Sequence, residues 1–167
     1  MAGERGSRMR AEPSERLDPR AKRLWRLEGL ITSVFLLIPT LGAFLLLDRV
    51  VDAAALVRAL PWLVWALLVV LIAVISPDLR WRRWRYEITD HEVDLQRGLL
   101  YVTRTLVPLA RVQHVDTQQG PLERWQGLST VVFYTAAGPN RIPALATPRA
   151  DEVRDRIAAL TGTQDEL

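Results

Sequence analysis

The chain has 167 residues, a mass of 19.0 kDa and a formal net charge of +3. It contains no cysteine, which excludes disulfides, thiolate catalysis and cysteine-ligated metal sites. Residues 1–85 hold 14 basic and 8 acidic residues, whereas residues 86–167 hold 8 basic and 11 acidic ones. Because a nucleic-acid-binding domain carries its basic surface on the folded domain itself, the mildly acidic second half argues against that function.

The amino-terminal segment is rich in charges, glycine, serine and proline, a composition typical of disordered chains. We expect residues 1–24 to form a disordered, basic tail on the cytoplasmic side. Its arginines are consistent with a solvated tail that fixes the orientation of the protein, or with binding to anionic lipid.

Two apolar stretches follow, and each is long enough to cross a bilayer. Gly29–Leu47 has 19 residues without a charge, and Ala59–Ser76 has 18. A spanning helix needs roughly 20 mainly apolar residues, so the sequence predicts two transmembrane helices within residues 25–79, joined by an outer loop at 48–58. No small-x-small site clearly follows the first stretch, which disfavours a cleaved signal peptide. Neither stretch contains an ionisable residue, which favours an anchor over a transport pathway.

Basic residues flank the two stretches unequally. Eight precede the first, four follow the second, and the intervening loop holds two beside two acidic residues. Because Lys and Arg near span ends are retained on the cytoplasmic side, we expect a multi-pass protein of the cytoplasmic membrane with both termini in the cytoplasm. Five tryptophans near the predicted ends are expected to act as interfacial anchors in the headgroup layer. They are Trp25, Trp62, Trp65, Trp81 and Trp84.

Four arginines alternate with two of these tryptophans directly after the second stretch: Arg80, Arg82, Arg83 and Arg85. We call this set the arginine cluster. As a lipid-headgroup site it would attract anionic lipid with about 1 kcal/mol for each basic residue near the surface. The alternative is an orientation signal combined with interfacial anchoring, and a juxtamembrane arginine serves both roles.

From Tyr86 the pattern changes to short β-type segments separated by turns. Tyr86–Thr89 and Glu92–Gln96 alternate polar and apolar residues around Asp90-His91, which predicts a hairpin. A single helical turn is predicted at residues 122–126, between two glycines. Further strands are predicted at residues 101–107, 111–118, 129–136 and 140–145.

The chain is expected to end in an amphipathic helix. Thr147 is a suitable N-cap, Pro148 fits the first helical position, and apolar residues recur on one face from Ala150 to Leu160. These elements predict one small antiparallel β-domain whose open end the helix covers, followed by a flexible tail at residues 163–167.

One part of this domain resembles a known family. Val107–Val115 (VPLARVQHV), followed by Gln119–Arg124 (QGPLER) and Gly127-Leu128, resembles the membrane-anchored bacterial pleckstrin-homology (PH-like) proteins of the YdbS type. The resemblance covers residues 20–160. It implies a two-helix transmembrane hairpin followed by a cytoplasmic PH-like domain at residues 80–162. This domain would be an antiparallel β-barrel or sandwich of about seven strands capped by a C-terminal α-helix. It implies no established biochemical activity.

The most motif-like positions of the domain suggest a docking rim for a protein partner. These positions are Arg111, Gln113, Glu123, Arg124 and Trp125. The alternative is that Glu123 and Arg124 stabilise a tight turn while Trp125 packs over the mouth of the barrel.

Signals for catalysis and for ligand binding are weak. Eukaryotic PH domains bind phosphoinositides through basic residues around the first hairpin, whereas the corresponding turn here, Thr89–Glu92, carries carboxylates that would repel phosphate. No glycine-rich phosphate loop, G-x-S-x-G or H-E-x-x-H occurs. His91 and His114 lack an acidic metal-binding pattern, and no serine or second base completes a catalytic set around His114 and Asp116. We therefore expect no enzyme activity, no cofactor, no metal and no small-molecule substrate.

The sequence thus predicts a non-catalytic integral membrane protein that presents a PH-like domain as a scaffold. Its expected partners are the lipid bilayer and either itself or another membrane PH-like protein, because related proteins often occur beside larger members with several such domains. The alternative function is an anionic-lipid sensor that uses the arginine cluster.

Overall fold

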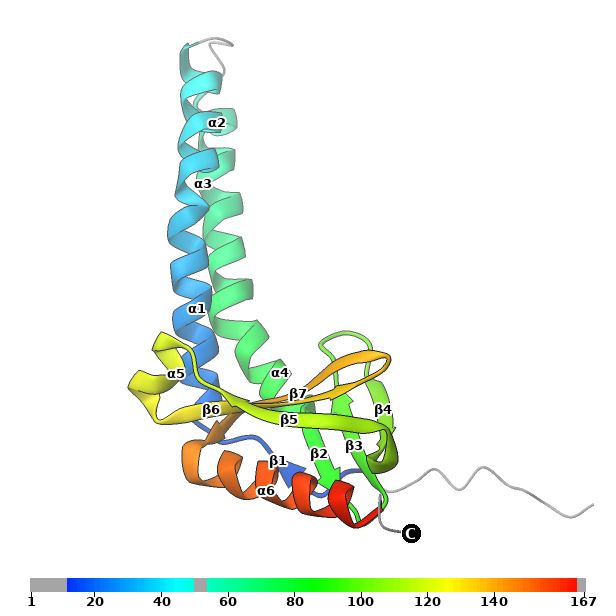
Figure 1. The fold of residues 1–167 in the computed structure, drawn as a ribbon. Helices are drawn as coiled ribbons and strands as arrows, with labels where there is room; N and C mark the ends of the chain where they lie inside the picture. Colours follow the sequence, from blue (N-terminus) through cyan, green and yellow to red (C-terminus); the bar gives the residue numbers. More distant parts are fainter. Residues whose placement is uncertain (1–11, 50–53, 165–167) are drawn as a thin grey trace, which may run out of the picture.

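The computed structural model describes residues 12–49 and 54–164, and consists of a long helical hairpin that stands on a small β-sandwich (Figure 1). The first arm comprises α1 (Ala21–Phe35) and α2 (Leu37–Arg49); the second comprises α3 (Ala55–Val69), the π-helical segment η1 (Val70–Ile75) and α4 (Ser76–Arg83). Each arm is 29 residues long and apolar enough to cross a membrane, and almost none of its apolar window is buried.

Both arms extend beyond the predicted apolar stretches, because the charged turns that flank them continue the helices. Prolines account for the two irregularities. Pro39 has no N–H for the carbonyl of Phe35, and the first arm is interrupted at Leu36. Pro77 likewise cannot bond to the carbonyl four residues earlier, and the wider η1 segment directly precedes it. Most of the described part of the predicted outer loop is helical, Ala54 is the N-cap of α3, and residues 50–53 lie outside the described residues.

Two antiparallel sheets form the sandwich, with strand orders β1-β2-β3-β4 and β5-β6-β7. The strands of the first sheet are β1 (Glu15–Arg16), β2 (Arg85–Ile88), β3 (Glu92–Arg97) and β4 (Thr103–Pro108). Those of the second are β5 (Val112–Gln118), β6 (Leu128–Thr135) and β7 (Gly138–Ala146). The 3-10 turn η2 (Leu109–Arg111) joins the sheets, α5 (Pro121–Gln126) joins β5 to β6, and α6 (Thr147–Gln164) follows β7.

The predicted strands agree with these elements to within three residues at each end. The predicted hairpin is confirmed by the pairing of β2 with β3, in which Tyr86 lies opposite Leu95. The expected barrel is not closed, because no hydrogen-bonded strand pair among the described residues joins the two sheets. The alternative form of that prediction, a sandwich followed by a C-terminal helix, is correct. The predicted flexible tail begins inside α6, and residues 165–167 lie outside the described residues.

The prediction of a disordered tail at residues 1–24 is wrong for its described part. Glu15 and Arg16 form β1 and pair with the start of β2, while Leu17 is only 2% exposed. Helix α1 already begins at Ala21. A two-residue strand has no sequence period, and its partner follows about 70 residues later, so composition alone could not reveal it. Residues 1–11 lie outside the described residues.

The ends of the hairpin and the sandwich share one hydrophobic core. Leu24 and Trp25 from α1, and Trp84 after α4, pack in the same buried cluster as Phe133 of β6 and Ile157 of α6. The two arms therefore do not hang from the domain by flexible linkers, and the predicted boundary at residue 80 divides a continuous core. This packing fixes the orientation of the sandwich relative to the helices (Figure 1).

Candidate functional site at the base of the helical hairpin

The two arms approach closely where the apolar stretches begin and end. A Cβ atom added to Gly29 would lie 2.9 Å from the Cα of Ala73 and 3.0 Å from the carbonyl oxygen of Ile72, so the contact needs glycine. The Ser33 hydroxyl donates to the Gly29 carbonyl at 2.7 Å, and the indole N–H of Trp65 donates to the Ser33 carbonyl at 2.9 Å. Direct backbone contact and an interhelical hydrogen bond therefore hold the arms together.

Charged contacts join the arms just outside the apolar stretches. The carboxylate of Asp78 lies 2.8 Å from Nη2 of Arg26 and 3.6 Å from Nζ of Lys22. The Lys22 ammonium also lies 4.1 Å from the centroid of the Trp81 ring. Since Arg26 is three residues before Gly29, these charges lie about 5 Å along the helix from the apolar stretch. The base of the hairpin therefore has the polarity of a membrane–water interface.

The structure contradicts the predicted anchor role for two of the five tryptophans. Trp25 and Trp84 are 6% and 4% exposed, so their rings belong to the core and do not contact headgroups. Trp81 is half-buried, and its N–H donates to backbone carbonyls of the segment before α1 at 3.1 and 3.2 Å. Trp65 directs its N–H into the hairpin. Trp62 is exposed near the distal end of the hairpin, and its role as an anchor remains a prediction.

The arginine cluster does not form one site. The Arg80 guanidinium stacks over a buried indole of α1 at 4.2 Å. Arg83 donates to two carbonyls of the β3–β4 loop, the second at 3.3 Å. Arg85 lies 3.3 Å from a glutamate carboxylate of the amino-terminal segment. Arg82 is exposed and has no ion pair in the described part of the chain. Three of the four charges therefore have partners within the protein.

The predicted docking rim is divided between two places. Arg111 and Gln113 lie at the start of β5, whereas Glu123, Arg124 and Trp125 lie on α5, beyond the other end of this strand. A seven-residue strand separates them by roughly 20 Å. Glu123 stabilises its turn, as the alternative prediction held, because its carboxylate accepts the N-cap amide of α5 at 2.8 Å and a threonine hydroxyl of β6 at 2.7 Å. Trp125 does not cover a barrel mouth, since it is 76% exposed.

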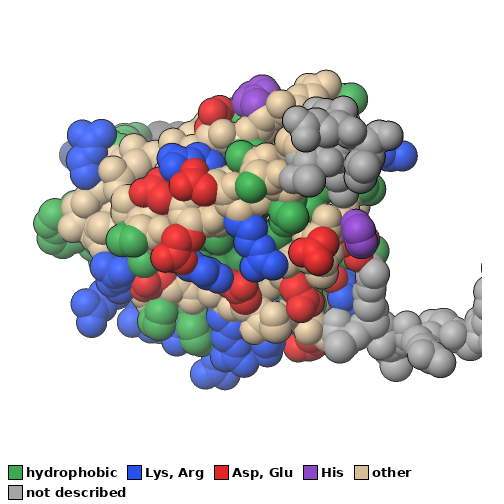
Figure 2. All heavy atoms as spheres, turned by 60° about the horizontal axis from the view of Figure 1, so that its bottom comes forward, with side chains coloured by type: hydrophobic (Ala, Val, Ile, Leu, Met, Phe, Trp, Pro, Cys, Tyr) green, Lys and Arg blue, Asp and Glu red, His purple; other side chains and the backbone are tan. Residues whose placement is uncertain are grey.

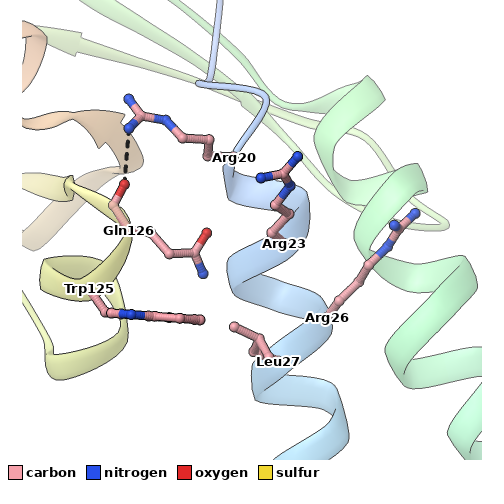
Figure 3. Close-up of a pocket in the computed structure, with 6 residues that line it drawn as sticks. All are labelled: Arg20, Arg23, Arg26, Leu27, Trp125 and Gln126. Atoms are coloured by element: carbon pink, nitrogen blue, oxygen red, sulfur yellow. Dashed lines mark hydrogen bonds between the residues drawn. The ribbon is translucent and has the colours of Figure 1, made fainter.

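A basic groove of about 490 Å³ lies between α1 and α5 (Figure 3). Its lining residues are Arg20, Arg23, Arg26, Leu27, Trp125 and Gln126. The Arg20 guanidinium donates to the Gln126 carbonyl at 3.0 Å, which ties α1 to α5. Among the described residues no acidic side chain lines this groove, although Arg20 and Arg26 have carboxylate partners just outside it. The sequence analysis missed it because the two walls are about 100 residues apart. The available signal was a basic residue at every third position from residue 20 to residue 26, namely Arg20, Arg23 and Arg26.

A second candidate surface lies at the open edge of the sandwich. Strand β4 is the last strand of its sheet, and its Leu106 is 45% exposed. A groove of about 350 Å³ runs between β4 and the β6–β7 turn, with Arg97 and Arg111 among its lining residues. An adjoining groove of about 430 Å³ contains Arg111 again, together with Gln113. The structure therefore brings this part of the predicted rim next to a strand edge that no described strand pairs with.

Comparison with known proteins identifies the fold family. The profile of the bacterial PH domain family matches residues 31–161. The chain belongs to this family. It is 38% identical to YdbS of Bacillus subtilis (strain 168), a UPF0699 transmembrane protein, over 95% of this chain and 99% of YdbS. It is 26% identical to a second transmembrane protein of that organism, YdbT, over 50% of this chain but only 17% of YdbT. No solved structure matches.

These similarities support the membrane interpretation of the two apolar arms, so this bacterial PH domain protein is a membrane protein. Its first hairpin turn, Thr89–Glu92, is the turn whose carboxylates were expected to repel phosphate. Strand β2 runs away from the end of α4, and this turn therefore lies at the end of the sandwich remote from the helices (Figure 1). Acidic and basic side chains are interspersed on this remote side (Figure 2). Both its position and its carboxylates argue against binding of bilayer headgroups by this turn.

An ion pair beside the buried Tyr86 ties the amino-terminal segment of this PH domain protein to α6. Nη2 of Arg149 donates to Oε2 of Glu15 at 2.7 Å, next to the hydroxyl of Tyr86. Burial, together with the neighbouring carboxylate, raises the pKa of Tyr86 to about 12. Burial alone would raise the pKa of Glu15 as well, but its contacts with Arg149 and Tyr86 hold that pKa below its ordinary value. These contacts stabilise the position of β1.

The histidines considered in the sequence analysis lie on the surface. His114 stacks on Tyr134 with 4.2 Å between ring centroids, and its Nε2 lies 3.9 Å from the carboxylate of Asp116. His91 is exposed in the remote hairpin turn. Within residues 12–49 and 54–164, no group of three His, Asp or Glu side chains could hold a metal ion.

Proposed function

We propose that this protein is a non-catalytic docking platform in the cytoplasmic membrane. Both termini lie in the cytoplasm, and the hairpin fixes the PH domain at the inner face of the bilayer. The distribution of basic residues around the two arms supports this topology, because such residues are retained on the cytoplasmic side.

The observation that carries the proposal is the core shared by the hairpin and the sandwich. Because Leu24, Trp25 and Trp84 pack with Phe133 and Ile157, the domain keeps one orientation relative to the bilayer. A platform of fixed orientation presents the same surface to every membrane-bound partner and raises the effective concentration of that surface near the membrane. A flexibly tethered domain would lose part of this advantage.

The docking surface is the outer edge of β4 with the adjoining groove. An extended segment can add to an unpaired strand edge through main-chain hydrogen bonds while its side chains enter the groove. Arg97 and Arg111 line the groove and no acidic residue of the described part of the chain does, which favours a segment with acidic side chains. We propose that this segment belongs to another membrane-anchored PH domain protein, or to a second copy of this chain.

Site-specific photo-crosslinking in native membranes tests the docking role. A photoreactive amino acid replaces Leu106 on β4 in one variant and the exposed Ala158 on α6 in the control variant. We expect a protein adduct that forms at position 106 and is much weaker at position 158, and mass spectrometry of the adduct identifies the partner. Equal labelling at both positions, or no protein adduct at position 106, would refute docking at this edge.

The alternative function, an anionic-lipid sensor built on the arginine cluster, has less support. Arg80, Arg83 and Arg85 contact an indole, backbone carbonyls and a carboxylate, respectively. A headgroup would have to displace these contacts. Arg82 alone offers little more than the attraction of a single surface charge.

A further inference from the structure

The β3–β4 loop exposes four consecutive apolar side chains, Leu99–Val102. The two central residues are the most exposed, Leu100 by 82% and Tyr101 by 87%. The backbone of this loop has a specific conformation. Gly98 begins it at a φ of +143°, where a Cβ atom would lie 1.8 Å from the carbonyl oxygen of Tyr101. Arg83 then donates to the carbonyls of Leu99 and Leu100. The apolar side chains are therefore held outward by a specific backbone turn.

The residues beside this loop indicate its depth relative to the bilayer. Leu99 lines the same cavity as Ser76, which is the last residue of the second apolar stretch. Side chains of this arm just before Ser76 are exposed as well, Val74 by 51% and Ile75 by 42%. In a membrane those side chains face lipid. The loop therefore continues the lipid-facing surface of the hairpin at the level where hydrocarbon gives way to headgroups.

Trp125 occupies the corresponding position beside the other arm. Its ring lines the basic groove together with Leu27, which is two residues before the first apolar stretch (Figure 3). Figure 1 shows α5 and the β3–β4 loop on opposite sides of the hairpin, both on the side of the sandwich that faces the helices. An exposed indole near the end of a span has the amphipathic character of an interfacial anchor.

We infer that the PH domain is seated directly on the bilayer, in the leaflet on its own side. The Leu99–Val102 loop and Trp125 enter the boundary between headgroups and acyl chains, and the exposed Arg23 in the basic groove contacts the phosphates of anionic phospholipids. The occupant of this surface is lipid because both contact points continue the lipid-facing surface of the membrane-spanning arms. The remote face of the domain, with its interspersed charges, remains in water (Figure 2). This inference is independent of docking at β4.

Spin labels on single cysteines test the seating, and the absence of native cysteine makes such variants simple to prepare. The full chain is reconstituted in nanodiscs that contain phosphatidylcholine and phosphatidylglycerol. The variants Leu100→Cys and Trp125→Cys alter exposed side chains, and Ala158→Cys on α6 is the control. We expect the first two labels to collide more with oxygen and several-fold less with an aqueous nickel complex than the control label. Nickel accessibility at position 100 equal to that of the control would overturn the inference.

The role of the basic groove is tested by comparing two lipid compositions. The label at position 125 is measured in nanodiscs of pure phosphatidylcholine and in nanodiscs with phosphatidylglycerol. We expect the label to lie deeper in the anionic bilayer, and Arg23→Gln to remove this difference. The exposed Arg141 on β7 provides the control variant Arg141→Gln, in which the difference in label depth between the two bilayers should persist. Equal depth in both lipids for the parent, or persistence of the difference in Arg23→Gln, would refute recognition of anionic headgroups in this groove.

Discussion

Replacement of Leu17 by alanine tests whether the segment before the first helix belongs to the folded domain. Leu17 is 2% exposed and lies in the core cluster beside the buried tryptophans. Truncation of a buried leucine to alanine removes its transfer free energy and leaves a cavity, at a cost of about 2–5 kcal/mol. For a domain of this size, 1 kcal/mol corresponds to about 4–8 °C in Tm. Even a loss of about 2 kcal/mol in the free energy of unfolding therefore lowers the Tm by about 8–16 °C.

Thiol reactivity provides a suitable assay for this prediction. Ala150 on α6 is fully buried, and a cysteine at this position reacts with a maleimide only when the domain opens. In the Ala150→Cys background, Leu17→Ala should lower the temperature at which maleimide labelling occurs by about 8–16 °C. The matched control is Leu30→Ala, since Leu30 is 49% exposed on the lipid-facing side of α1 and should change the Tm little. If both variants melted with the parent, the assignment of this segment to the core would be refuted.

Three further predictions follow from the structure. Gly29→Leu should separate the arms and lower the Tm, because a side chain there meets the backbone of the facing arm. Gly42→Leu should leave the Tm unchanged, because a Cβ atom at Gly42 has no described neighbour within 4 Å. Equal melting of the two variants would contradict the close approach of the arms at Gly29. Because the folded pKa of Tyr86 is about 12 and the unfolded one about 10, its contribution to stability is present below about pH 10 and lost as the pH rises toward 12. Melts across this range should show a steeper loss for the parent than for Tyr86→Phe, and parallel curves would contradict the raised pKa. In protein extracted from the bilayer into detergent, Arg83→Ala should increase chymotryptic cleavage in the β3–β4 loop, because the loop loses its hydrogen bonds, whereas Arg82→Ala should leave cleavage unchanged. Unchanged cleavage in both variants would count against the tethering of the loop.

Parts of the candidate site were predictable from the sequence, and parts were not. The hairpin Tyr86–Gln96 was found because alternation of polar and apolar residues along a strand is a local property. The tryptophans illustrate the limit. Trp25 and Trp84 lie near span ends, where indoles commonly contact headgroups, yet tertiary packing buries both. Trp125 is exposed beside the hairpin, which contradicts the predicted packing over a barrel mouth and leaves its predicted role in docking untested.

The arginines show the same limit of prediction from sequence, here for their charges. Their number and distance from the spans predict orientation, because that rule depends on charge and position alone. Whether an individual guanidinium is available to a ligand depends on its partners, and those of Arg80, Arg83 and Arg85 come from separate parts of the fold. The basic groove required α1 and α5 to meet, and no local pattern encodes that contact.

The sequence by itself determined that two apolar segments are long enough to cross a bilayer and that a β-domain with a terminal helix follows them. Hydropathy, strand alternation and helix capping are set by neighbouring residues, so they can be recognised along a single chain. Only the tertiary structure decided that residues before the first arm enter the sheet, which tryptophans are buried, and which faces of the domain lie beside the helices. These features depend on contacts between segments that are far apart in the sequence, such as β1 with β2 and α1 with α5, and the energy of such contacts exists only once the chain is folded.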